Sequence, residues 1–255
     1  MKIKVIRGGR TVLAVAAAIL FFALTAAVRV SGAYAVVTGA AVRELPIYCV
    51  GREDKKIAIS FDCAWGVDST DKILEILERE NARATFFMVE FWAKKYPQYV
   101  KRIDEKGNEI GTHSATHSYM SKLSEEKIRS ELDSSSRAIS SVTGKKVELF
   151  RAPYGDYNDR LIRTARDAGY YTIQWDVDSL DWKDLSANEI AMRVISRVKS
   201  GSIILCHNNG KHTAEALPVI LDTLKNRGFS FVPIGELILR DHYTIDASGK
   251  QTAVG

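Results

Sequence analysis

Residues 56–63 read KIAISFDC, a mostly apolar run that ends in an aspartate and a cysteine. Short runs rich in Ile, Val and Phe, bounded by polar residues, are typical of strands that are buried on both faces. Similar runs recur along the chain and alternate with charged, amphipathic stretches of helical length. We therefore predict a series of strand–helix units, in which right-handed crossovers join parallel strands.

The series contains seven predicted strands, each followed by a stretch of helical periodicity. The strands cover residues 56–61, 84–89, 109–112, 148–151, 170–176, 202–206 and 229–233. The helices begin near Ser69, Glu90, Ser124, Asn158, Ser186 and Thr213, and a last helical segment covers residues 234–240. Seven such units fit a barrel or an open doubly wound sheet, and both place a site at the carboxyl ends of the strands.

The first 35 residues predict a targeting segment. Residues 1–10 are basic, and Thr11 to Val28 is an uncharged run of 18 residues, which meets the lower limit for a membrane-spanning helix. The basic flank predicts an inside N-terminus and an external domain. Ala33-Tyr34-Ala35 offers a cleavage site, so an anchor and a removed signal peptide both remain open. We expect an extracytoplasmic protein, with the membrane as a partner if the helix is retained.

Charge and cysteine content narrow the function of the remaining chain. The formal net charge is +5, but five of the 36 basic residues lie in residues 1–35, which contain no acid. The other 31 basic residues balance 31 acidic ones, so a nucleic-acid partner is not expected. Three cysteines are not a disulfide framework. We divide this part into a connector (36–55) forming a stalk or short strand, a main domain (56–240) and a loose polar tail (241–255).

Ionisable residues follow five of the predicted strands. They are Asp62 and Cys63, His113 and His117, Arg151, Asp178 and Asp181, and His207. Because the carboxyl ends of parallel strands meet at one edge, we expect these side chains to share a pocket. His113 and His117 are four residues apart, so on a helical turn both imidazoles face the same way and suit one small metal ion. A catalytic zinc site needs a third protein ligand, which the pair at 62 and 63 must supply.

The same residues form motifs that resemble the NodB-type polysaccharide deacetylases, carbohydrate esterase family 4. The motifs occur in the family's order across residues 55–240. They are Ser60-Phe61-Asp62-Cys63, His113-Ser114-Ala115-Thr116-His117, Arg151 to Gly155, Asp178 to Trp182, and Leu205 to His207. The resemblance implies a distorted (β/α)7 barrel and the metal-dependent removal of acetyl groups from a cell-wall polysaccharide, with peptidoglycan favoured.

The resemblance also implies roles for single residues. Asp62 would be the general base, oriented by Arg151, and His207 the general acid, held by Asp178. Trp182 and Leu205 would line the acetyl pocket, and the backbone N–H of Tyr154 would help bind the oxyanion. His113 and His117 would bind a divalent metal, with zinc expected and cobalt, manganese or nickel as alternatives.

Cys63 departs from the family pattern, because the family has a metal-binding aspartate at that position. A thiolate is a good zinc ligand, so Cys63 either completes a Cys/His/His site or is a small buried residue. The N-terminal helix and Ala64-Trp65-Gly66 resemble the PdaB-like branch, which is associated with sporulation. The alternative functions are a glycan-binding pseudoenzyme with impaired catalysis and a hydrolase of a different amide or ester.

Overall fold

The computed structural model describes residues 43–254. The predicted targeting segment and the first part of the connector lie outside this range. Within the described residues, no helix combines the length and the apolar character needed to cross a bilayer.

The main sheet has eight strands, and all of its pairings are parallel. Its order is β6-β5-β4-β3-β2-β8-β7, and β9 pairs with the start of β2. The strands are β2 (Lys56–Cys63), β3 (Thr85–Met88), β4 (Glu109–Thr112), β5 (Leu149–Phe150), β6 (Tyr171–Thr172), β7 (Val177–Asp178), β8 (Ile203–His207) and β9 (Ser230–Phe231). The prediction of parallel strands is confirmed. Among the described residues no pairing joins β6 to β7, so the sheet is open there.

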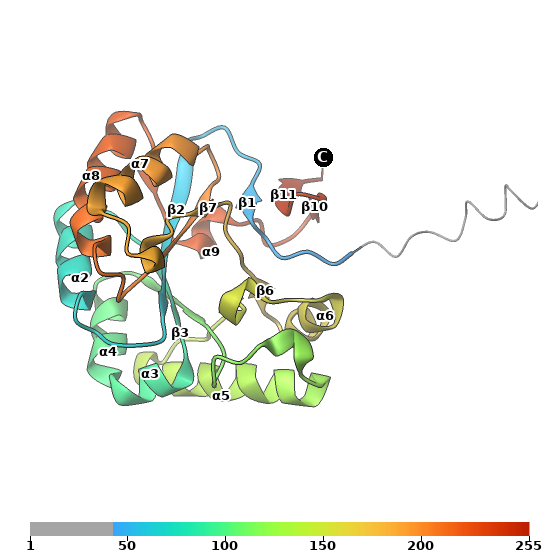
Figure 1. The fold of residues 1–255 in the computed structure, drawn as a ribbon. Coiled ribbons are helices and arrows are strands. Elements are labelled where there is room, and N and C mark those ends of the chain that lie inside the picture. The colour runs from blue at the N-terminus through green and yellow to red at the C-terminus, as the bar shows by residue number, and fades with distance from the viewer. Residues whose placement is uncertain (1–42, 255) are drawn as a thin grey trace, which may run out of the picture. The chain divides into compact units, whose positions relative to one another are not determined.

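Helices cover the sheet in two groups (Figure 1). The α-helices are α2 (Thr70–Arg79), α3 (Glu90–Lys95), α4 (Pro97–Glu105), α5 (Glu125–Thr143), α6 (Asp159–Asp167), α7 (Ala187–Arg197), α8 (Thr213–Asn226) and α9 (Ile234–Leu237). Short 3₁₀ turns occupy Met120–Lys122, Pro153–Gly155 and Asp181–Lys183. Helices α2, α7 and α8 pack together, and α3, α4 and α6 pack against α5.

Strand β2 lies at the centre of the sheet because its sequence tolerates burial on both faces. All of its residues after Lys56 are buried. Phe61 and Cys63 belong to the apolar core beneath the helices, and Phe61 stacks on Phe86 of β3 with ring centroids 5.0 Å apart. Side chains alternate along a strand, so Asp62, between these two, points to the opposite face. This alternation directs one carboxylate toward the pocket described below.

The structure corrects two expectations about the predicted elements. The predicted strand 170–176 is two short strands, β6 and β7, separated by an irregular segment. The helix that begins at Glu90 ends at Lys95, and Pro97 starts the separate helix α4. A proline is tolerated in a first helical turn, where its missing N–H has no partner to lose, but not in a helix interior.

The tail after residue 240 is not loose, so that prediction is wrong. Strands β10 (Tyr243–Ile245) and β11 (Lys250–Ala253) form an antiparallel hairpin, and β11 also pairs in parallel with β1 (Cys49–Val50). The expectation of a short strand in the connector is therefore confirmed. Such strands are hard to predict from a polar sequence, because backbone pairing rather than an apolar pattern holds them in place.

Candidate active site

A pocket of about 630 Å³ opens at the carboxyl ends of β2, β4, β7 and β8. Most of the predicted site residues line it: Asp62, His113, His117, Tyr154, Asp178, Asp181, Trp182, Leu205 and His207. The expectation that these side chains share one pocket is therefore confirmed. Arg151 lies behind the wall, completely buried, and Cys63 does not line the pocket.

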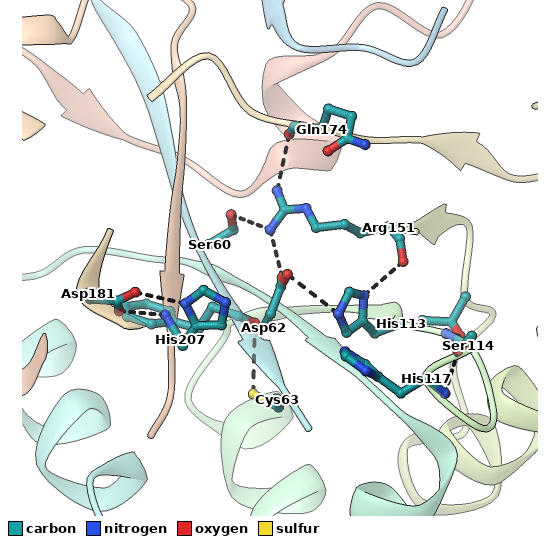
Figure 2. Close-up of polar contacts among 12 residues, drawn as sticks. Ser60, Asp62, Cys63, His113, Ser114, His117, Arg151, Gln174, Asp181 and His207 are labelled. Atoms are coloured by element: carbon teal, nitrogen blue, oxygen red, sulfur yellow. Dashed lines mark hydrogen bonds and ion pairs between the residues drawn. The ribbon is translucent and has the colours of Figure 1, made fainter. Parts of the chain in front are cut away.

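Asp62 and Arg151 form a buried ion pair (Figure 2). Arg151 Nη1 donates to Asp62 Oδ1 over 2.8 Å and to Ser60 Oγ over 2.9 Å, and Nη2 donates to the Gln174 carbonyl over 3.2 Å. Burial by itself would raise the pKa of Asp62, but the charge of Arg151 outweighs it and lowers the pKa. The pocket therefore contains a carboxylate that is held ionised and fixed in orientation.

His113 and His117 meet in the pocket through a loop rather than through a helical turn. His113 directly follows β4, and the next residues turn sharply, because Ser114 and His117 have φ values of 73° and 56°. The two imidazole centroids are 5.0 Å apart. The expectation of a shared helical turn is wrong, although the imidazoles do lie together.

Glu131 of α5 holds this loop in place. Its buried carboxylate accepts hydrogen bonds from the backbone N–H groups of Ala115 and Thr116, over 3.0 and 2.8 Å, and from the Thr116 hydroxyl over 3.0 Å. Three hydrogen bonds to one buried carboxylate offset part of the free-energy cost of the left-handed backbone at Ser114 and His117. Sequence analysis missed Glu131, since nothing in its helical context distinguishes it from a surface acid.

The nitrogens of the two histidines have different environments. His113 Nδ1 lies 2.8 Å from the Arg151 carbonyl and must donate to it, which leaves Nε2 as an acceptor facing Asp62 Oδ2 at 3.5 Å. His117 Nδ1 is buried without a hydrogen-bond partner. Burial lowers the pKa of both histidines, that of His117 to about 4. Both are therefore neutral at pH 7.

Cys63 lies on the other side of β2, in the apolar core (Figure 2). Its side chain is completely buried, its sulfur faces the Phe61 carbonyl at 3.8 Å, and burial raises the pKa of the thiol well above its usual value. A protonated thiol inside the core is not a zinc ligand. The alternative in which Cys63 is a small buried residue is therefore the one that the structure supports.

This placement bears directly on the expected metal. The part of the chain that the structure describes contains no group of three or more His, Cys, Asp or Glu side chains arranged to hold an ion. Two imidazoles and the paired carboxylate of Asp62 do not make the three-ligand set of a catalytic zinc. The residues present do not fit the predicted Cys/His/His site.

His207 is held by Asp181 and not by Asp178, which corrects the role expected for Asp178. His207 Nδ1 and Asp181 Oδ1 are 2.7 Å apart, and Asp181 Oδ2 accepts from the backbone N–H of His207 and from the Thr213 hydroxyl. Asp178 instead accepts from the backbone N–H of Leu180, over 2.8 Å. Leu180 has a φ of 56°, so Asp178 stabilises a turn that brings Asp181 beneath the imidazole.

Asp181 also sets the charge of His207. Burial by itself would lower the pKa of the imidazole, but the hydrogen bond and the charge of Asp181 outweigh it and raise the pKa, with smaller contributions from Asp62 and Asp178. The imidazole is thus held ready to donate a proton from Nε2 into the pocket.

Aromatic and aliphatic side chains complete the walls. Trp182 lines the pocket and is 57% exposed, while Leu205 is buried beside His207 on β8. Tyr154 is 56% exposed and has a φ of 61°, which is unusual for a bulky residue. Trp65 also lines the pocket and is 56% exposed.

We expect Asp181→Asn to lower the rate of the expected deacetylation at neutral pH by about a hundredfold, because His207 is the expected general acid. The loss of the carboxylate lowers the pKa of His207, so activity that needs the protonated imidazole is lost at a lower pH than in the wild type. The measurement is the rate as a function of pH. Asp178→Asn is the matched control and should move the profile less, in the same direction. A larger shift for Asp178→Asn would contradict the assignment.

Comparisons with known proteins agree with this geometry. The family model described as polysaccharide deacetylase matches residues 50–173. A peptidoglycan-N-acetylglucosamine deacetylase of Bacillus cereus is 36% identical over 198 residues, which cover 76% of this chain and 92% of the relative.

A solved structure with a similar fold is described as a pseudoenzyme and not as an active deacetylase. It is a CE4 family pseudoenzyme from Bacillus anthracis, 35% identical, with a TM-score of 0.73 over 75% of this chain and 68% of that chain. A mutant of the same protein is described as having restored enzymatic activity; it is 36% identical and also has a TM-score of 0.73, over 75% of this chain and 70% of that chain. Similarity in this range therefore includes both active and inactive proteins.

Proposed function

The chain belongs to the polysaccharide deacetylase family, and on this premise we propose that it removes N-acetyl groups from the amino sugars of a cell-wall polysaccharide. One observation carries the proposal: a carboxylate held ionised by Arg151 and an imidazole held by Asp181 face the same pocket. A positioned base and a positioned acid in one pocket are the groups that general acid–base catalysis of amide hydrolysis uses.

In the proposed reaction, Asp62 accepts a proton from a water molecule whose oxygen bonds to the acetyl carbon. His207 then donates its proton to the amide nitrogen as the carbon–nitrogen bond breaks, so that acetate and a free amine leave. Arg151 lowers the pKa of Asp62 and so favours its ionised form, and Asp181 raises the pKa of His207 and so favours its protonated form. We assign the acetyl-binding wall to Trp182 and Leu205, and an oxyanion contact to the backbone N–H of Tyr154.

We propose peptidoglycan as the substrate, because the Bacillus cereus relative is named for that polymer and is covered almost completely. An extracytoplasmic location follows from such a substrate and from the basic, apolar N-terminus. Membrane attachment, the divalent metal and a link to sporulation stay predictions of the sequence.

A second candidate function, a glycan-binding domain with impaired catalysis, is favoured by the position of Cys63. Because the thiol is turned into the core, the described residues offer the histidine pair no third metal ligand. This feature is compatible with the likeness to a pseudoenzyme. In this reading the pocket still recognises an N-acetylated sugar but turns it over slowly.

The test is the release of acetate from purified peptidoglycan and from N-acetylglucosamine oligomers, measured with and without added Zn²⁺, Co²⁺, Mn²⁺ or Ni²⁺. Acetate release that His207→Ala abolishes is the expected result. Binding of the oligomers without acetate release under any of these conditions would favour the second candidate. Neither binding nor release would contradict both.

A further inference from the structure

A ledge of exposed aromatic rings continues the pocket wall outward from Tyr154. Tyr119 stacks on Tyr154, with ring centroids 4.4 Å apart and ring planes inclined by 19°. Tyr154 in turn meets the edge of His117 at 4.6 Å, and His117 meets Trp65 at 4.8 Å. Four rings thus form a continuous row, whose outer end is Tyr119. We call Tyr119, Lys122 and Tyr154 the tyrosine ledge.

The phenol hydroxyls of the ledge are not occupied by polar groups of the described residues. Tyr119 is 49% exposed, and within the described residues no hydrogen bond to either phenol hydroxyl is found. Tyr154 keeps a left-handed backbone conformation that costs about 1–2 kcal/mol for a residue with a side chain. A strained backbone that holds an exposed ring at a pocket mouth is typical of a binding surface.

The ledge is also positively charged. Lys122 Nζ lies 4.7 Å from the centre of the Tyr119 ring, and no carboxylate within the described residues lies within 4 Å of it. Arg160 donates to the Ser121 carbonyl over 3.1 Å and likewise has no carboxylate partner there. The carboxylate of Asp156, which lies beside this segment, is bonded to the backbone N–H and hydroxyl of Ser121. Asp178 and Asp184, by contrast, are among the acids that line the pocket itself.

We propose that the tyrosine ledge binds a carboxylate-bearing sugar next to the N-acetyl sugar held in the pocket. Phenol rings offer a sugar an apolar face and a hydroxyl partner, and the Lys122 ammonium offers the carboxylate an ion pair. The preferred substrate is then an acidic amino-sugar polymer and not a neutral chitin-like chain. The inference rests on the proposed function, because it needs the glycan in the pocket.

The test is the dissociation constant of the full-length chain for two matched oligosaccharides, measured by calorimetry at low salt. One alternates N-acetylglucosamine with N-acetylmuramic acid, and the other is the N-acetylglucosamine oligomer of equal length. Lys122→Gln should weaken binding of the acidic oligosaccharide about threefold, as expected for an exposed ion pair, and leave the neutral one unchanged. Tyr119→Ala should weaken both about fivefold. Lys101→Gln, an exposed lysine of α4, is the charge-matched control and should change neither.

Two further arms identify the source of the carboxylate. The methyl ester of the lactyl group should bind like the neutral oligomer, and 1 M salt should remove the effect of Lys122→Gln. A fragment whose lactyl group carries a peptide should regain affinity only if a peptide carboxylate reaches Lys122. Equal affinity for the free acid and its ester, or an equal loss for both oligosaccharides in Lys122→Gln, would overturn the proposal.

The proposal about the ledge and the proposal of hydrolysis can be contradicted separately, because binding is measured without turnover. A chain that prefers the acidic oligosaccharide but releases no acetate contradicts hydrolysis and supports the ledge. A chain that releases acetate but does not distinguish the two oligosaccharides contradicts the ledge and supports hydrolysis.

Discussion

Replacing Asp62 with asparagine is expected to lower the rate of acetate release by about a thousandfold, the loss typical of a missing general base. The same change should lower the free energy of unfolding by about 3 kcal/mol, because it leaves the Arg151 charge buried without its partner. Acetate release and urea-induced unfolding are the two measurements. Asp178→Asn, the same chemical change at an acid without an ion-pair partner in the described residues, should have little effect on stability.

A double substitution separates catalysis from stability. Adding Arg151→Met to Asp62→Asn removes the unpaired charge and should recover part of the lost stability, while activity stays absent. Wild-type stability in Asp62→Asn alone would contradict the view that a buried ion pair links β2 to the segment after β5.

Replacing Cys63 with aspartate is expected to add a third metal ligand beside His113 and His117, which the described residues of the wild type do not provide. Without metal, a carboxylate at this position faces the core and lies next to Asp62, so the variant should be less stable by about 2 kcal/mol. If the new carboxylate turns toward His113 and His117, added Zn²⁺ should bind with one ion per chain, raise the melting temperature and increase acetate release at least about tenfold. Metal content, thermal unfolding and acetate release are the three measurements.

Cys63→Asn is the matched control, since it has the same shape as aspartate without the charge, and it should gain neither metal nor activity. One tightly bound zinc ion in the wild type that Cys63→Ala removes would contradict the structural placement of the thiol. Because metal content is measured directly, that outcome can be distinguished from a variant that merely folds poorly.

Much of the fold could be predicted from local pattern. The predicted strand 109–112 and the helix starts at Glu90 and Thr213 match the structure, and the other strands and helix starts, apart from strand 170–176, lie close to their predicted positions. The prediction of a loose tail was wrong because residues 243–253 carry no apolar pattern, and pairing with β1 orders them. The break between β6 and β7 was missed because the alternation of polar and apolar residues in 170–176, YYTIQWD, continues through the point where the backbone leaves the sheet.

Some features of the candidate site could also be predicted from local pattern, and others could not. That Asp62, His113 and His207 share a pocket followed from their position after parallel strands, because such ends meet at one edge. The orientation of Cys63 away from the pocket was also accessible, since neighbours on a strand point to opposite faces. The sequence could not show that Asp181 rather than Asp178 holds His207, because this depends on a left-handed turn at Leu180. It also could not show that Glu131 supports the histidine loop, because this depends on how α5 packs.

The amino-acid sequence by itself determined that strands and helices alternate, that an acid and several bases gather at one sheet edge, and which family the motifs resemble. Periodicity and strand direction are enough for that. Only the tertiary structure decided which carboxylate holds His207, how Glu131 supports the histidine loop, and that Tyr119 stacks on Tyr154 beside the pocket. These depend on distances of a few ångströms between segments far apart in the chain, set by packing and loop conformation that no local pattern encodes.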